Sequence, residues 1–216
     1  MLDRPIRRLI DPLLEPPARW IASRGVSANA VTIIGFLLGI VSCAAIAGSH
    51  YGVALVLLLG NRLADGLDGC VARRRGVTDV GGFLDIVLDI LFYGGVPLSF
   101  AIADNNRMTA ASVLNYSFMA TSGSFLAFAV ISAKRGVTSG WGGKKSFYYS
   151  VGLMEGTETV IFFVLFCLLP THFNRLAWTF AGLCWLTALI RIATAVVLFA
   201  PPSPPPLPNH DEETTL

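Results

Sequence analysis

Four aspartates between residues 65 and 89 have the residue type and the spacing that metal-dependent chemistry needs. Asp65 and Asp68 are three residues apart, and Asp85 and Asp89 are four residues apart. Spacings of three and four place side chains on the same face of a helix. Because the two segments are consecutive and joined by a short connection, we expect two antiparallel helices whose four carboxylates converge.

Converging carboxylates need cations, because like charges a few ångströms apart oppose each other's ionisation. Oxygen ligands suit the hard cations Mg²⁺ and Mn²⁺, and magnesium held by carboxylates usually keeps positions open for substrate phosphates. Two such ions can clamp a pyrophosphate and stabilise its displacement. The four aspartates therefore predict a site for two divalent metal ions and a phosphate-bearing substrate.

Small and basic residues accompany the aspartates. Gly69 and Ala72 lie on the face of the first aspartate pair, and Gly81 precedes the second pair by one turn. Small side chains let helices approach closely or let a ligand reach the backbone. Arg73 can neutralise a phosphate through a forked hydrogen bond.

The composition indicates that a membrane protein carries these residues. Of 216 residues, 54% are hydrophobic and 14% are charged, with a mean hydropathy of +0.64, which is too apolar for an ordinary soluble domain. The net charge of +2 is small, and we expect no nucleic-acid partner. The four cysteines form no CxxC pair and are interpreted as buried hydrophobic residues.

Six apolar stretches reach the length of about 20 residues that a helix needs to cross a bilayer. The sequence therefore predicts an all-α fold, a six-helix transmembrane bundle, which forms one domain over residues 25–200. The predicted spans are Ala28–Gly48, Tyr51–Ala72, Gly81–Ala103, Ala110–Ala133, Phe147–Leu169 and Leu176–Ala200.

The two ends of the chain differ from the bundle. Residues 1–24 predict a juxtamembrane amphipathic helix that lies on the membrane surface and is broken by Pro12, Pro16 and Pro17. Residues 201–216 are proline-rich and then acidic, and we expect them to be disordered.

Basic residues mark one side of the predicted bundle. They gather in the N-terminal segment and after the second and fourth spans, whereas the opposite connections contain only Arg107 and Arg175. By the positive-inside rule, the basic side faces the cytoplasm. We therefore expect a multi-pass membrane protein with its aspartates on the cytoplasmic face and both termini in the cytoplasm.

The aspartate segment resembles the signature of the CDP-alcohol phosphatidyltransferase family, D-x2-D-G-x2-A-R followed by a spacer and G-x3-D-x3-D. Here the segment reads Asp65-x2-Asp68-Gly69-x2-Ala72-Arg73 and then Gly81-x3-Asp85-x3-Asp89, so every fixed position matches. The spacer between Arg73 and Gly81 is one residue shorter than is usual in the family.

The resemblance implies an enzyme, often a homodimer, that transfers a phosphatidyl group from CDP-diacylglycerol to a small alcohol and releases CMP. It implies that two divalent ions, Mg²⁺ or Mn²⁺, bind to Asp65, Asp68, Asp85 and Asp89, and that Asp89 is the general base.

By the same resemblance, the CDP part of the lipid donor binds next to the metal ions. Gly69, Ala72 and Arg73 would contact it, and Thr78 would place a small hydroxyl near the diphosphate.

Two groups of residues are candidates for recognising the acceptor. Lys134 and Arg135 end the fourth span and either bind an acceptor phosphate or anchor the helix at the membrane surface. Glu155 and Glu158 are expected two or three turns inside the fifth span, where they either bind the acceptor or pair with Arg191. Lys144 and Lys145, before that span, are interpreted as membrane anchors.

Two other membrane-protein functions use clustered carboxylates. One is a magnesium-dependent prenyltransferase that binds an isoprenyl diphosphate. The other is a divalent-metal transporter, although its carboxylates would be expected near the membrane midplane rather than at one face.

Overall fold

The computed structural model describes residues 3–136 and 154–200, and these residues form seven α-helices and no strand. The predicted all-α fold is therefore confirmed for this part of the chain. The helices are α1 (Asp3–Ser23), α2 (Ala28–Ala47), α3 (Tyr51–Arg75), α4 (Asp79–Ala103), α5 (Met108–Lys134), α7 (Gly156–Leu168) and α8 (Phe173–Phe199), with short 3₁₀ helices η1 (Asn105–Arg107) and η2 (Pro170–His172).

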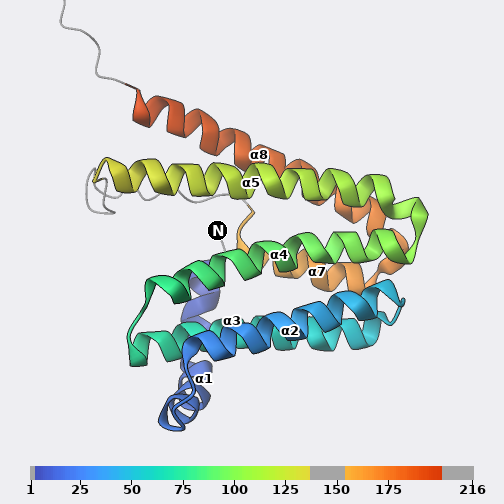
Figure 1. Ribbon diagram of the computed structural model, residues 1–216. Helices are drawn as coiled ribbons and strands as arrows, with labels where there is room; N and C mark the ends of the chain where they lie inside the picture. Colours follow the sequence, from blue (N-terminus) through green and yellow to red (C-terminus); the bar gives the residue numbers. More distant parts are fainter. Residues whose placement is uncertain (1–2, 137–153, 201–216) are drawn as a thin grey trace, which may run out of the picture.

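The helices form a layered bundle. Figure 1 shows α2 and α3 side by side in one layer, α4 and α7 in the next, and α5 and α8 beyond them. Helix α1 runs across the direction of the others, near the end of the bundle where α3 ends and α4 begins. The aspartate-bearing ends of α3 and α4 therefore share one end of the bundle, and the 3₁₀ helices lie at the opposite end.

Four helical segments are long and apolar enough to cross a membrane: Ala28–Ala47, Asp79–Ala103, Asn105–Lys134 and Pro170–Phe199. Two other helices are not among these four segments. Helix α7 is apolar but has only 13 residues, and α3 has a lower hydropathy because its second half carries several charges. Five of the six predicted spans match a helix whose ends differ by at most three residues.

The predicted span Phe147–Leu169 is wrong at its start. Met154 and Glu155 are not helical, and α7 begins only at Gly156. The physical reason is a capping box, in which the side chains of Glu155 and Glu158 bind each other's backbone N–H groups and so begin a helix. Residues 147–153 and the predicted tail, residues 201–216, lie outside the described part of the chain.

Helix α1 corrects a second expectation, because it continues through Pro12, Pro16 and Pro17 instead of breaking. Its inner face packs on α3, where Leu14 is 6% exposed and Ala18 is fully buried. Two ion pairs, Arg73–Asp11 and Arg74–Glu15, also join α3 to α1. Packing and ion pairing to α3 therefore outweigh the hydrogen bonds that the prolines remove.

An aromatic core joins the helices that flank the site. The rings of Phe100 and Phe173 stack with centroids 4.5 Å apart, and Phe92 meets Phe163 edge-on at 6.1 Å. All of these side chains are at most 1% exposed. The aromatic core therefore fixes α4 against α7.

The four cysteines are free and buried, as the sequence predicts.

Close packing also joins α2 to α3. A Cβ atom on Gly35 would lie only 2.8 Å from the Cβ atom of Ala64, so the two helix backbones meet at this point. The Asn61 side-chain amide donates to the Gly35 carbonyl oxygen at 2.8 Å, and the Ser42 hydroxyl donates to the Ala54 carbonyl oxygen at 2.8 Å. Small residues and interhelical hydrogen bonds thus hold α3 in place.

Gly35→Ala is expected to lower the free energy of unfolding by about 1–3 kcal/mol, because the added methyl group must push α2 away from α3. Gly52→Ala is the matched control, since nothing lies within 4 Å of a Cβ atom built there. Denaturant titration of both variants in detergent micelles measures the difference. Equal stability of the two variants would contradict close packing at Gly35.

Candidate active site

A connection of three residues brings the aspartates of α3 and α4 together. Gly76 ends α3 with φ +104°, a backbone conformation that suits glycine. Thr78 is the N-cap of α4, and its hydroxyl accepts a hydrogen bond from the Gly81 N–H at 3.1 Å. The chain therefore turns back within three residues. Helices α3 and α4 are not the packed neighbours that the sequence predicts, because both pack mainly on α2, and only their aspartate-bearing ends converge.

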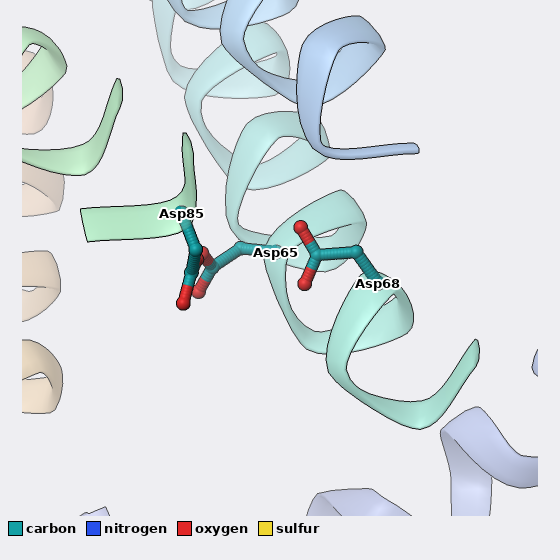
Figure 2. Close-up of side chains that lie close together, drawn as sticks. All are labelled: Asp65, Asp68 and Asp85. Atoms are coloured by element: carbon teal, nitrogen blue, oxygen red, sulfur yellow. The ribbon is translucent and has the colours of Figure 1, made fainter. Parts of the chain in front are cut away.

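Three of the four aspartates form a tight group. One carboxylate oxygen from each of Asp65, Asp68 and Asp85 lies within 4.8 Å of the other two. Figure 2 shows the carboxylates of Asp65 and Asp85 next to each other, with the carboxylate of Asp68 facing them from the next turn of α3. This spacing fits three oxygen ligands that surround one divalent cation at about 2.0–2.6 Å.

The fourth aspartate, Asp89, lines a small pocket together with the other three, but its carboxylate is bound by an arginine. Asp89 accepts a hydrogen bond from Arg62, whose Nη2 atom lies 2.7 Å from the Asp89 Oδ1 atom. Arg62 also approaches Asp65, with 3.7 Å between Nη1 and Oδ2. The structure thus gathers three aspartates within ligand distance and places the fourth against an arginine.

Two residues of this site, Arg62 and Thr32, were not predicted from the sequence. Thr32, on α2, donates from its hydroxyl to the Asp68 Oδ2 atom at 2.6 Å. For Arg62, the signal was a cation one turn before Asp65 inside an otherwise apolar stretch, since such charges are usually functional. No sequence pattern distinguishes Thr32, because its role depends on the packing of α2 against α3.

A cavity of about 430 Å³ opens on one side of the carboxylates. Its wall contains all four residues that the resemblance assigns to the CDP-linked lipid, namely Gly69, Ala72, Arg73 and Thr78. The guanidinium of Arg73 is half-exposed and forms an ion pair with Asp11 of α1, with 3.4 Å between Nη2 and Oδ2.

A second cavity, of about 490 Å³, lies against Asp65, Asp89 and Arg62 and extends to the start of α7 at Gly156 and Thr157. The two cavities share four wall residues, Asp68, Gly69, Arg73 and Asp85. The carboxylates therefore lie where two separate spaces meet, and one substrate could approach from each.

The candidate acceptor residues fall in different places. Lys134 and Arg135 are exposed at the end of α5, and the Arg135 Nη2 atom donates to the Phe199 carbonyl oxygen at 2.8 Å. Within the described part of the chain, neither residue lines either of the two cavities. Lys144 and Lys145 lie outside the described residues.

Glu155 and Glu158 do not lie two or three turns inside a helix, as predicted, because they form the capping box that begins α7. They therefore flank Gly156 and Thr157, which line the second cavity. Arg191 donates to the Thr121 carbonyl oxygen at 2.8 Å and to the Ser124 hydroxyl at 3.2 Å, and it interacts electrostatically with Glu155. Acceptor recognition and pairing with Arg191 both stay predictions.

The profile of the CDP-alcohol phosphatidyltransferase family matches residues 26–200. The chain belongs to the CDP-alcohol phosphatidyltransferase family. It is thus a transferase of phospholipid synthesis, as the aspartate signature predicts, and this membership favours the phosphatidyltransferase over the prenyltransferase and the transporter.

Individual relatives of this phosphatidyltransferase cover most of its length. The inner membrane protein YnjF of Escherichia coli is 46% identical over 193 residues, which are 89% of this chain and 94% of that protein. An archaetidylinositol phosphate synthase of Pyrococcus horikoshii is 27% identical over 194 residues, or 88% and 94% of the two chains. Together with the apolar helices, these matches identify an integral membrane protein.

A solved structure shares the fold of the phosphatidyltransferase. It is the Mycobacterium tuberculosis phosphatidylinositol phosphate synthase with CDP-DAG bound, which has a TM-score of 0.64 and 22% sequence identity. The match covers 86% of this chain and 94% of that chain. The helical bundle that positions the aspartates is therefore the fold of that enzyme.

Thr32→Val is expected to raise the Mn²⁺ concentration needed for half-maximal activity by about 10-fold, because Asp68 loses the hydroxyl that orients it. Saturating Mn²⁺ should restore most of the activity. Thr179→Val is the control, since the Thr179 hydroxyl only donates to a carbonyl oxygen of its own helix. Identical Mn²⁺ dependence in both variants would show that Thr32 does not support a metal ligand.

Proposed function

We propose that this phosphatidyltransferase uses CDP-diacylglycerol as its donor, a small polar alcohol or alcohol phosphate as its acceptor, and the two cavities to bring them together. The observation that carries the proposal is the position of the aspartates where the two cavities meet. This arrangement suits a displacement at phosphorus, because the attacking oxygen approaches the phosphorus on the side opposite to the one from which the leaving oxygen departs.

The cavity of about 430 Å³ is the proposed site for the CDP part of the donor. Gly69 and Ala72 carry little or no side chain, so a phosphate can come close to the backbone of α3. Arg73 can exchange its exposed contact with Asp11 for a donor phosphate, which accepts two hydrogen bonds from a guanidinium. The Thr78 hydroxyl completes this wall, although it also caps α4.

The aspartates fit two divalent ions, Mg²⁺ or Mn²⁺. Asp65, Asp68 and Asp85 would hold one ion, as their oxygen spacing allows, and Asp89 would complete the site of the second. When bound, such ions neutralise charge that develops on the phosphoryl and leaving oxygens. The hydrogen bond from Thr32 keeps Asp68 directed toward its neighbours.

Asp89 is the proposed general base. Its carboxylate faces the cavity of about 490 Å³, where the acceptor would bind. As the acceptor oxygen forms its bond to the lipid-bearing phosphorus, Asp89 takes the hydroxyl proton. The bond from that phosphorus to the CMP oxygen breaks, and CMP leaves with the bonding electrons into the other cavity.

The acceptor belongs to the cavity that α7 closes. Glu155 and Glu158 lie next to the cavity wall and are the proposed acceptor contacts, whereas Lys134 and Arg135 are better placed as membrane anchors. Because a relative that matches 88% of the chain is an archaetidylinositol phosphate synthase, inositol phosphate is the first acceptor to test.

The same proposal sets the orientation in the membrane. We propose that residues 25–200 form a six-span domain, in which α3 and α7 are two further spans beside the four long apolar segments. The site and both termini then lie on the cytoplasmic side. Exposed Leu9, Leu13 and Trp20 suit α1 to the membrane surface. A homodimer, usual in the family, completes the assembly.

The purified protein with Mn²⁺ and CDP-diacylglycerol is expected to release CMP with only some of four acceptors: inositol phosphate, glycerol phosphate, inositol and serine. Asp89→Asn should lower this rate by about 100-fold or more, because the general base is lost. Asp79→Asn, an exposed aspartate in the first turn of the same helix, is the control and should keep the rate. Absence of CMP with every acceptor would contradict the proposed function.

A further inference from the structure

Arg62 is a buried arginine inside the bundle, on α3, one turn before Asp65. Its side chain is only 11% exposed. Burying an arginine costs free energy unless its N–H groups are hydrogen-bonded, so the contacts of Arg62 indicate what it does. Neither the aspartate signature nor the proposed mechanism above assigns it a role.

The three nitrogens of the guanidinium each have a separate partner. The Nε atom donates to the Asn61 side-chain oxygen at 2.7 Å, Nη1 donates to the Tyr93 hydroxyl at 3.1 Å, and Nη2 donates to Asp89 at 2.7 Å. The guanidinium carbon also lies 5.0 Å from the Phe92 ring centroid and 5.3 Å from that of Tyr93. Together these contacts fix the plane of the group.

This network is anchored in the backbone of a third helix. Asn61, which orients Arg62 through Nε, itself donates to the Gly35 carbonyl oxygen of α2 at 2.8 Å. Asn61 is 3% exposed, and Gly35 lies at the closest approach of α2 and α3. The position of Asp89 on α4 is therefore tied to the α2–α3 contact through two side chains.

The consequence falls on one carboxylate oxygen. The 2.7 Å contact engages Oδ1 of Asp89, whereas its Oδ2 atom has only a long 3.5 Å contact with Nη1. Asp89 lies outside the close group of Asp65, Asp68 and Asp85 and lines the cavity proposed for the acceptor, so its less strongly engaged oxygen, Oδ2, is the one available to take a proton.

We propose that Arg62 is a positioning residue for the general base: with Tyr93 and Asn61, it holds the carboxylate of Asp89 in the orientation that receives the acceptor proton. This role rests on the proposed function of the site. Arg62 does not line the cavity proposed for CDP, whereas the half-exposed Arg73 does and is available for the donor phosphates. The expected signature is a loss in kcat with little change in KM for the donor.

The experiment compares Arg62→Met and Arg62→Lys with wild type in detergent micelles, using CDP-diacylglycerol, Mn²⁺ and whichever of the four acceptors wild type converts fastest. Loss of a partner that orients a functional side chain usually lowers activity by about 10- to 100-fold. Arg62→Met should therefore lower kcat by up to about 100-fold with the donor KM within about threefold of wild type. Arg62→Lys keeps the positive charge but not the forked guanidinium, and its kcat should be about 10-fold higher than that of Arg62→Met.

Arg107→Met is the matched control. Arg107 lies at the opposite end of the bundle and has similar contacts: its Nη1 donates to the Tyr51 hydroxyl at 2.8 Å, and it pairs with Asp104. This variant should keep the wild-type kcat even where it lowers stability. Should Arg62→Met not fold, Arg62→Lys alone decides, since its kcat must fall below that of wild type at unchanged KM.

Two results would overturn the positioning role while leaving the proposed function intact. One is a wild-type kcat in both Arg62 variants. The other is a donor KM that rises by the same factor as kcat/KM falls, which would make Arg62 a substrate-binding residue. If wild type itself releases no CMP, the proposed function fails, and the positioning role fails with it.

Discussion

Electrostatic repulsion among the aspartates is the constraint on which the rest of this structure depends. Asp65, Asp68 and Asp85 present oxygens within 4.8 Å of one another at the meeting ends of two helices, an arrangement that is unfavourable without compensating cations. The surrounding helices reduce this cost, since Thr32 donates to Asp68 and Arg62 binds Asp89. Bound divalent ions would balance the remaining charge, and this balance is the reason for proposing a metal site here.

The same arrangement explains why this chemistry takes place in a membrane bundle. A lipid donor must keep its acyl chains in the bilayer while its head group and the acceptor meet in water. Aspartates at one end of the bundle satisfy both needs, because one cavity faces the residues assigned to CDP and the other reaches the start of α7. The first residues of α7, Gly156 and Thr157, form part of the wall of the second cavity.

The sequence predicts the parts of the molecule that follow from local pattern. Apolar length located five of the six predicted helices, of which four are long and apolar enough to cross a membrane. The spacing of Asp65 and Asp68 placed their carboxylates on one helix face. The errors come from interactions that periodicity does not encode: the capping box of Glu155 and Glu158, and the packing on α3 that keeps α1 helical through its prolines. The role of Arg62 was not predicted because its partners, Asp89 and Tyr93, lie on another helix.

Metal binding by the aspartate group is the central claim, and electron paramagnetic resonance of Mn²⁺ tests it most directly. Titration of the purified protein without substrates should show that Asp65→Asn, Asp68→Asn and Asp85→Asn each weaken Mn²⁺ binding by about 10-fold or more, because each removes a charged ligand. The neighbouring exposed Asp79→Asn should bind Mn²⁺ as wild type does. Equal Mn²⁺ affinity in all five proteins, wild type included, would contradict the account.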